Sequence, residues 1–349
     1  MKKVLMVIFE VQYGGAENIA ELMSSALEEM GYCIDIITNS KKLVSKLDKL
    51  NGKIYLCKNE IRDVYKIFKS ISFKSYGCVI AHKWDGIYIM RKICVKNQIP
   101  LIAVVHSLYY EGLEKDRKLN VNIIKVINED CDIVIAISES QAKNLFLAGV
   151  KESKIILLIN VSKKIEKIEY QKCNSKILYV GRLSHEKGVD LLLDAIKLRE
   201  NLKEVKVDIV GDGPERQYLE ELAFQRYHLK NVVFQGYQEN IVDFYKTAKF
   251  VVVPSRREAF SLVALEAKMM GVPIVGFNTG GLKENILDRI TGELVEEENV
   301  NCLGATIEKM YMNSELCALY SQNAKKVWKN SNDLYAWKNL LNKIVGMYY

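Results

Sequence analysis

The stretch FVVVPSRREAFSLVALEA, residues 250–267, joins a short apolar run to a segment rich in helix-forming residues. Pro254 and Ser255 end the apolar run, as residues at the end of a strand commonly do. A strand that leads directly into a helix is the repeating unit of a parallel α/β sheet. Ligands bind such sheets beyond the carboxyl ends of the strands. The loop with Glu258 and the helix with Glu266 therefore form the first candidate site.

The same pattern recurs along the whole chain, where short apolar runs alternate with amphipathic stretches of helical length. The runs are VLMVIF, CIDIIT, KIYLC, CVIAH, PLIAVVH, DIVIAIS and KIILLI in the first half, and KILYV, VKVDIV, NVVFQG, FVVVPS and VPIVGF in the second. At 349 residues the chain is too long for one ordinary core. We therefore predict an α/β protein of two Rossmann-like domains, each with a doubly wound parallel sheet, linked by the charged residues 161–175.

The net charge of +7 is confined to the first half of the chain. Residues 1–165 hold 25 Lys and Arg against 18 Asp and Glu, whereas residues 166–349 hold 25 of each kind. Such an excess indicates an acidic partner for the first domain, either a membrane surface or a nucleic acid. The chain has no recognisable nucleic-acid motif, so we expect no nucleic acid among its partners.

The opening apolar run, Val4 to Phe9, is shorter than the roughly 7–15 residues of a signal-peptide core. No later run approaches the roughly 20 residues of a membrane span. We expect a cytoplasmic protein that is at most peripheral on the inner face of the membrane. The eight cysteines include no CxxC pair and the histidines have no metal-ligand spacing, so we expect reduced core thiols and no metal site.

Two further loops that follow apolar runs have the composition of anion sites. Gly14 and Gly15 lie at a strand-to-helix turn and leave the backbone amides open to an anion, without the GxGxxG spacing of an NAD enzyme. In GRLSHEKG, residues 181–188, Arg182 and Lys187 can converge on a diphosphate. Taken alone, the first is equally a plain tight turn and the second a solvated loop.

A third loop, GDGP, offers Gly211 and Gly213 just before a helix. In the opening stretch, the amides at the start of the helix suit phosphate, and the two carboxylates suit the hydroxyls of a sugar and a ribose. These amides belong to Phe260, Ser261, Leu262 and Val263. The plain alternative is that Glu258 is a charge favoured by the helix dipole and Glu266 a solvated surface residue.

In this order and at these spacings the motifs resemble those of the retaining GT-B glycosyltransferases of family four, the glycosyl transferases group 1. The resemblance covers nearly the whole chain. It rests on Gly14-Gly15, His106 after PLIAVV, GRLSHEKG, GDGP, the E-x7-E of Glu258 and Glu266, and VPIV followed by Gly280-Gly281 and Glu284. The chain departs from the family where EAFSL stands in place of the commoner EGFGL, which adds Cβ atoms at Ala259 and Ser261.

The resemblance implies a GT-B fold with an acceptor-binding domain at 1–163 and a donor-binding domain at 164–332. It also implies a C-terminal helix, at 333–349, that packs back on the first domain. By the same resemblance Glu266 holds the ribose of the donor and Glu258 holds the hydroxyls of the donor sugar.

The resemblance further implies that Arg182 and Lys187 bind the donor diphosphate, with help from the Gly14-Gly15 loop and the helix-start amides. His106 reaches the reacting sugar from the acceptor domain. We expect the choice of base to depend on main-chain and side-chain contacts near Gly236, Tyr237 and Glu239, which motif spacing does not resolve. We assign no role to the remaining histidines, which are His82, His185 and His228.

We therefore predict a retaining hexosyltransferase that needs no metal and no cofactor. It moves a hexose or N-acetylhexosamine from a nucleotide sugar, a UDP-sugar in preference to a GDP-sugar, to a glycan or lipid-linked acceptor of the bacterial cell-surface type. Two alternatives stay open. One is a nucleotide-sugar epimerase of the same architecture, and the other is a non-catalytic nucleotide-sugar-binding module.

Residues 60–74 form a predicted helix whose Arg62, Lys66 and Lys69 make a basic stripe. Ile67 and Phe73 lie outside the apolar arc, so we expect exposed apolar groups beside the lysines. That combination is typical of an interfacial helix. It predicts that the first domain docks on an anionic membrane surface.

Overall fold

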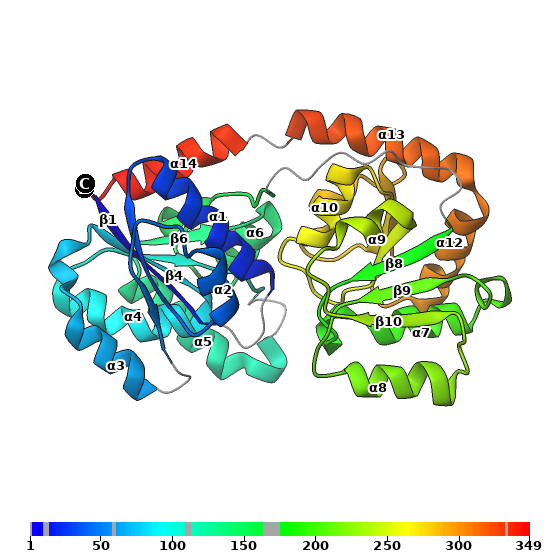
Figure 1. Ribbon diagram of the computed structural model, residues 1–349, viewed down its shortest axis with the longest axis horizontal. Coiled ribbons are helices and arrows are strands. Elements are labelled where there is room, and N and C mark those ends of the chain that lie inside the picture. The colour runs from blue at the N-terminus through cyan, green and yellow to red at the C-terminus, as the bar shows by residue number, and fades with distance from the viewer. Residues whose placement is uncertain (1, 10–13, 58–60, 109–112, 163–174, 332–333) are drawn as a thin grey trace. The chain divides into compact units, whose positions relative to one another are not determined.

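The computed structural model describes residues 2–9, 14–57, 61–108, 113–162, 175–331 and 334–349. The chain forms two compact units (Figure 1). Unit 1 comprises Met1–Asn160 and Asp333–Tyr349, and unit 2 comprises Val161–Asn332. The predicted domain boundary after residue 163 lies outside the described residues.

Unit 1 is built on seven parallel strands in the order β3-β2-β1-β4-β5-β6-β7. The strands are β1 (Lys3–Ile8), β2 (Cys33–Thr38), β3 (Ile54–Leu56), β4 (Cys78–His82), β5 (Leu101–Val104), β6 (Ile133–Ala136) and β7 (Ile155–Leu157). The central strands are continuously apolar because helices cover both faces of a parallel sheet. From β1 the chain builds outward to β3 and then restarts at β4, on the other side of β1. The topological switch point therefore lies between β1 and β4.

The helices of unit 1 lie on both faces of this sheet (Figure 1). They are α1 (Gly15–Glu29), α2 (Lys41–Lys46), α3 (Ile61–Ser70), α4 (Lys83–Asn97), α5 (Leu113–Asp130), α6 (Glu139–Leu147) and α14 (Leu334–Gly346), with the 3-10 turns η1 (Phe73–Ser75) and η2 (Glu152–Lys154). Helices α3, α4 and α5 share one hydrophobic cluster with the sheet. The C-terminal helix α14 packs against α1, and Tyr32 donates a hydrogen bond to Asn342 at 2.9 Å. As expected, the last helix belongs to the first unit.

Unit 2 is built on six parallel strands in the order β10-β9-β8-β11-β12-β13. The strands are β8 (Lys176–Val180), β9 (Val207–Val210), β10 (Val232–Gly236), β11 (Ala248–Val253), β12 (Ile274–Phe277) and β13 (Gly292–Val295). The switch point of this sheet lies between β8 and β11. The predicted class of two doubly wound α/β units is confirmed.

In Figure 1, α9 and α10 lie on one side of the unit 2 sheet and α7 and α8 on the other. A separate hydrophobic cluster fills each side. The helices and turns are η3 (His185–Lys187), α7 (Val189–Lys197), η4 (Glu200–Leu202), α8 (Arg216–Glu221), the π-helical turn η5 (Leu222–Arg226), α9 (Val242–Thr247), α10 (Leu262–Met270), α11 (Leu282–Asn285), α12 (Val300–Met312) and α13 (Ser314–Ser331).

The apolar pattern predicts only five strands in unit 2 and misses β13. Glu293 breaks the apolar character of this strand, yet its side chain is buried. The carboxylate is tolerated because Tyr320 and Lys309 each donate to its Oε1 atom at 2.7 Å. A charged residue with partners on α12 and α13 leaves no strand signal in the local sequence.

The prediction that Phe73 is exposed beside the basic stripe of α3 is wrong. Phe73 is buried and packs edge-on against Phe68. Ile67 is half-buried against the same cluster, whereas Lys66 and Lys69 are exposed. The side chain of Arg62 lies outside the described part of the chain. Helix α3 thus presents charge without the expected aromatic group. In the described ranges, no helix is both long and apolar enough to cross a membrane.

Most of the cysteines occupy the predicted core positions. The described cysteines are free thiols, and all but Cys302 are buried. Burial raises the pKa of the Cys78 and Cys131 thiols to about 12. Such thiols are inert at neutral pH, so they serve the core as small apolar groups.

Candidate active site

The loops that follow β8 and β11 meet at the switch point of unit 2. Gly188 has a φ of 65°, and a Cβ built on it would lie 1.9 Å from the carbonyl oxygen of Pro254 in the other loop. Glycine permits both this backbone conformation and this close approach. As a result Lys187 and Glu258, 71 residues apart, form an ion pair with Nζ 2.7 Å from Oε1.

Glu258 is fixed by a set of short bonds. Ser255 Oγ donates to the same Oε1 atom at 3.0 Å, and Gly281 N donates to the Glu258 carbonyl at 2.8 Å. The Glu258 side chain is 9% exposed, and that of Lys187 is 26% exposed. An ammonium group has three donors, so Lys187 can hold Glu258 and a phosphate oxygen together. The pair is preorganised for a ligand with both hydroxyl and phosphate groups.

Arg256 clamps the two loops together. Its guanidinium donates two parallel bonds to Asp190, at 2.7 and 2.9 Å, and a third to the His185 carbonyl at 2.7 Å. A fourth bond runs from Nε to Glu298, after β13, at 3.0 Å. Although burial raises it, the pKa of the Asp190 carboxyl is lowered by the hydrogen bonds and charge of Arg256. The clamp therefore fixes both ends of the segment that carries Lys187.

Ser261 is the N-cap of helix α10 and has a φ of 70°. This is the left-handed conformation that the commoner glycine of the family adopts without strain. Ser261 Oγ accepts a hydrogen bond from Ala264 N at 3.3 Å, so a side-chain cap offsets the cost. Phe260 before it is buried, and Leu262 and Val263 after it are half-buried. The predicted helix-start residues thus form one turn directly beyond Glu258.

Glu266 lies on α10 and accepts a hydrogen bond from Tyr245 at 3.2 Å. Burial raises the pKa of Glu266 to about 7, and the bond from Tyr245 lowers it in part. Tyr245 is fully buried on α9, so it fixes the direction of the carboxylate. Near neutral pH this group is divided between its protonated and ionised forms.

The GDGP loop packs directly against the loop after β8. A Cβ built on Gly213 would lie 2.2 Å from the carbonyl oxygen of Leu183, and Leu183 N donates to the Asp212 carbonyl at 3.0 Å. Gly211 has a φ of 139° where the chain leaves β9. The half-buried Arg182 lies next to Leu183 in the same loop. The structure thus brings the GDGP loop into contact with the loop that carries Arg182.

Tyr237 lies near the GDGP loop, since the preceding Gly236 accepts a hydrogen bond from Gly211 N at 2.8 Å, but it lies far from Glu258. It follows β10, the edge strand, which is three strands from β11, or roughly 14 Å at the usual spacing of about 4.8 Å. The side chain is 52% exposed. The structure therefore places Tyr237 on the same edge of the sheet as Glu258 but does not bring the two together.

In unit 1, Gly14 and Gly15 lie at the start of α1, next to the switch point. Gly14 N donates to Glu17 Oε2 at 2.8 Å, and the buried Glu17 also pairs with Lys83 at the start of α4. The sequence gives no sign of this ion pair. The Gly14 amide is already satisfied by the Glu17 carboxylate, so this amide caps its own helix.

His106 lies two residues beyond β5, beside His82 at the end of β4. The His82 Nδ1 and His106 Nε2 atoms are 3.0 Å apart, and the two rings are within 18° of parallel. Burial and the charge of Lys83 lower the pKa of His106 to about 3. Both imidazoles are therefore neutral near pH 7, and His106 is a weak base.

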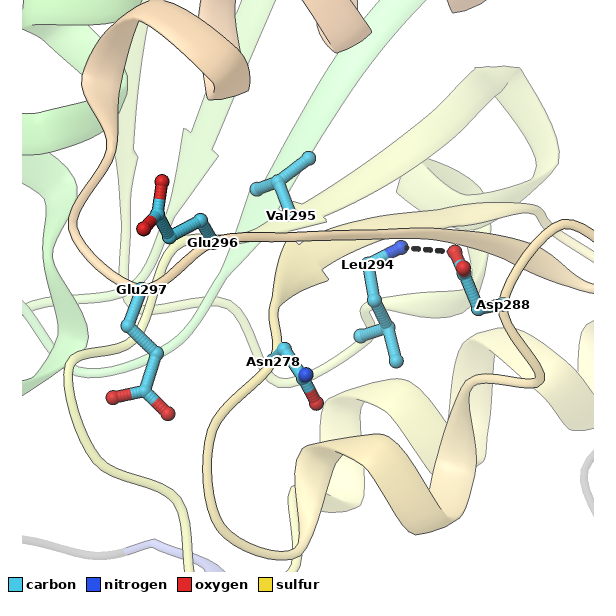
Figure 2. A pocket seen from close by; sticks show the side chains of 6 residues that line it. All are labelled: Asn278, Asp288, Leu294, Val295, Glu296 and Glu297. Atoms are coloured by element: carbon cyan, nitrogen blue, oxygen red, sulfur yellow. Dashed lines mark hydrogen bonds between the residues drawn. The ribbon is translucent and has the colours of Figure 1, made fainter.

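An open cavity of about 670 Å³ lies at the carboxyl ends of β12 and β13. Its lining residues are Asn278, Asp288, Leu294, Val295, Glu296 and Glu297 (Figure 2). None of them is a predicted site residue. The carboxylates in its wall repel a diphosphate, so the cavity is unsuited to the phosphates of a nucleotide sugar. Among the described residues, no group of three or more His, Cys, Asp and Glu could hold a metal ion.

Two family models match adjoining parts of the chain. The model of the glycosyl transferases group 1 matches residues 160–327, and that of Glycosyltransferase Family 4 matches residues 13–160. The chain is a group 1 glycosyltransferase.

Similar proteins cover most or nearly all of this glycosyltransferase. An uncharacterized glycosyltransferase of Methanocaldococcus jannaschii is 24% identical over 99% of this chain and 97% of its own. The N-acetyl-alpha-D-glucosaminyl L-malate synthase of Bacillus anthracis is 25% identical over 81% of each chain. The crystal structure of Anabaena HepE with UDP and glucose has a TM-score of 0.86 at 18% identity, over 99% of this chain and 100% of that one. The GT-B fold is confirmed.

The motifs of the glycosyltransferase do not reveal the residues that hold its site together. Arg256 and Asp190 are 66 residues apart, and His82 and His106 are 24 apart. Each pair joins segments at or after the ends of adjacent strands. A predicted strand order would bring these residues together as candidates, but the order is not visible in local spacing.

Proposed function

We propose that this glycosyltransferase moves a hexose or N-acetylhexosamine, with retention of the anomeric configuration, from a nucleotide sugar to a glycan or lipid-linked acceptor. The observation that carries the proposal is the Lys187–Glu258 pair at the switch point of unit 2, next to the start of α10. A cation beside a fixed carboxylate suits the bond that breaks, which joins a phosphate to a sugar. The cation faces the phosphate, and the carboxylate faces the sugar hydroxyls.

In the proposed reaction the bond between the anomeric carbon and the phosphate oxygen breaks, while a bond to the acceptor oxygen forms on the same face. The acceptor proton passes to the leaving phosphate. Lys187, Arg182 and the amides at the start of α10 stabilise the negative charge that develops on the diphosphate. Glu258 is not the nucleophile in this proposal, because the acceptor oxygen itself attacks on the face of the leaving phosphate and Glu258 binds the sugar hydroxyls.

We propose a UDP-sugar as donor and no metal requirement. The Anabaena structure with UDP and glucose, which shares the fold, supports the choice of base. The two cations of the loop after β8 supply the charge that a metal provides in other transferases. The test is a screen of UDP-glucose, UDP-N-acetylglucosamine and GDP-mannose with glycan and lipid-linked acceptors. We expect release of UDP and a product with the anomeric configuration of the donor. Release from GDP-mannose alone, or an inverted product, contradicts the proposal.

The same screen without an acceptor distinguishes transfer from epimerisation. An epimerase returns an isomerised nucleotide sugar from the donor alone, whereas a transferase leaves the donor sugar unchanged apart from slow hydrolysis. We expect no isomerised sugar. A binding module without catalytic activity would release no nucleoside diphosphate under any condition.

We also propose that the acceptor is reached at an anionic membrane surface. The support is the positive charge of the first half of the chain and the exposed Lys66 and Lys69 on α3. Each cation near such a surface contributes about 1 kcal/mol at most, and salt screens it. We expect sedimentation with anionic but not neutral liposomes, weakened by salt and by Lys66→Glu with Lys69→Glu. The exposed Lys203→Glu in unit 2 serves as control. Equal binding to both lipids removes this part of the proposal.

A further inference from the structure

The contact between His82 and His106 restricts where their protons lie. With 3.0 Å between His82 Nδ1 and His106 Nε2, one of these nitrogens donates and the other accepts. The His82 side chain is fully buried, and its other nitrogen, Nε2, has no hydrogen-bond partner in the described part of the structure. The two nitrogens of His82 are therefore in unlike environments.

The unlike environments decide the tautomer of His82. A proton on Nε2 would be a buried donor without an acceptor among the described residues, which is rare in proteins and costly. A proton on Nδ1 is used in the bond to His106, and Nε2 is then only an acceptor without a donor, the milder case. A second proton is disfavoured because burial, His106 and Lys83 together hold the pKa of His82 well below its usual range.

The tautomer of His82 in turn decides that of His106, because the nitrogen that accepts cannot carry the proton. We propose that His82 is a positioning residue that fixes His106 as its Nδ1-protonated tautomer, so that His106 presents an N–H donor, not a basic nitrogen, to a hydroxyl oxygen of the transferred sugar. This inference deepens the proposed function and rests on the contact between His106 and the transferred sugar that the family resemblance implies.

The fold holds His82 in place for such a role. Its backbone is in register with Ile8 of β1 on one side and with Val104 of β5 on the other, so it lies inside the sheet. Lys83, which follows, has a φ of 60° and pairs with Glu17. That ion pair offsets the positive charge nearest to the two rings.

The protonation state is observable directly by long-range ¹H–¹⁵N spectra of protein labelled at histidine, since the chain has 4 histidines. Loss of a signal in His82→Asn, His106→Ala and His185→Gln assigns the spectra. In the wild-type protein without substrate we expect His106 to carry its proton on Nδ1 from about pH 5 to pH 8. A proton on His106 Nε2 overturns the inference, and it leaves the sugar contact of His106 untouched.

Two substitutions of His82 separate positioning from packing. In His82→Asn the amide N–H₂ can replace the Nδ1 donor, whereas in His82→Leu an apolar group fills the space and no donor is left. We expect kcat/KM near wild type in His82→Asn and about tenfold lower in His82→Leu, the scale of one positioned hydrogen bond. A purely structural role predicts the reverse order, because the leucine suits a buried apolar site better than an amide.

Two readouts keep the inference distinct from the proposed function. The affinity for UDP should be unchanged in both His82 variants, since the proposed nucleotide contacts lie in unit 2. His106→Ala tests the sugar contact itself, and we expect at least the loss seen in His82→Leu. Full activity in His106→Ala would refute the contact. Equal activity of His82→Asn and His82→Leu would refute the positioning role.

Discussion

Loss of the Arg256 clamp should loosen the segment that carries Lys187 without unfolding unit 2. The side chains of Arg256 and Asp190 are 13% and 22% exposed, so this is a largely buried bidentate pair. Removing one partner of a buried pair costs roughly 3–5 kcal/mol, and an exposed pair contributes roughly 0–1 kcal/mol. Because the Arg256–Asp190 pair is partly exposed, we expect Arg256→Met to cost about 2–3 kcal/mol, between these two limits.

Hydrogen exchange of the peptide covering residues 184–191 measures this attachment locally. Two backbone hydrogen bonds lie within the clamped segment. Lys187 N donates to the Ser184 carbonyl at 2.9 Å, and Gly188 N donates to the His185 carbonyl at 3.2 Å. A change of about 2–3 kcal/mol in the free energy of opening corresponds to exchange roughly 30- to 150-fold faster. We expect this increase in the peptide, with kcat/KM lower by about ten- to a hundredfold as Lys187 loses its position.

Arg216→Met is the matched control. Arg216 also pairs with two carboxylates, Asp212 and Glu220, but its side chain is 36% exposed and both pairs span four residues. Exposed pairs of this spacing contribute about 0.3–0.5 kcal/mol, so exchange at residues 184–191 should change less than about threefold. If Arg256→Met exchanges no faster than the wild type, or no faster than Arg216→Met, Arg256 does not clamp the loops.

Four further predictions concern the proposed donor site. Lys187→Met should lower kcat by roughly 10²–10³, the cost of one transition-state donor, in steady-state assays of donor turnover; a near-wild-type rate contradicts its role. Glu266 should bind ribose hydroxyls best when ionised, so the Kd for UDP by calorimetry should fall as pH rises through about 7, and this dependence should be weaker in Glu266→Gln, where only the phosphate of UDP still titrates in this range. The same raised pKa means that Glu266 should make the fold less stable as pH rises from about 4.5 to about 7; a denaturation midpoint that responds identically in Glu266→Gln would exclude it. Finally, activity should persist in excess EDTA, and recovery that depends strictly on added Mn²⁺ or Mg²⁺ would overturn the metal-free proposal.

Much of the fold follows from the sequence because its signals are local. Each buried parallel strand is a continuous apolar run, and the run ends where a polar or glycine-rich loop begins, as at Val253 and Pro254. The same rule locates the loops with Lys187 and Glu258, since ligand loops follow the carboxyl ends of strands. Strand β13 escapes because Glu293 interrupts its run, and only the distant Lys309 and Tyr320 make that carboxylate acceptable.

The error at Phe73 has a related cause. A helical projection of residues 60–74 places it outside the apolar arc, but the structure ends α3 at Ser70 and puts Phe73 in a separate 3-10 turn. Past the end of a helix, the 3.6-residue period no longer predicts which side chains face the core. The residue is buried against Phe68, so its exposure could not be inferred from the phase of the preceding helix.

The partners of the site residues are the part that sequence spacing cannot supply, and the strand order explains why. Lys187 pairs with Glu258, and Arg256 pairs with Asp190, because strands β8 and β11 are neighbours in the sheet. In the chain, β9 and β10 come between these two strands. His82 and His106 meet because β4 and β5, which are consecutive in the chain, are also neighbours in the sheet. In both units the pairs lie at or next to the switch point, where two loops that leave adjacent strands diverge and leave room for a ligand. A residue that faces a ligand is visible as a motif within one loop, whereas the residue that holds it comes from the next strand of the sheet. It follows that the search for positioning residues in this fold should begin from strand adjacency, and His82 and Arg256 are the first two candidates that it yields.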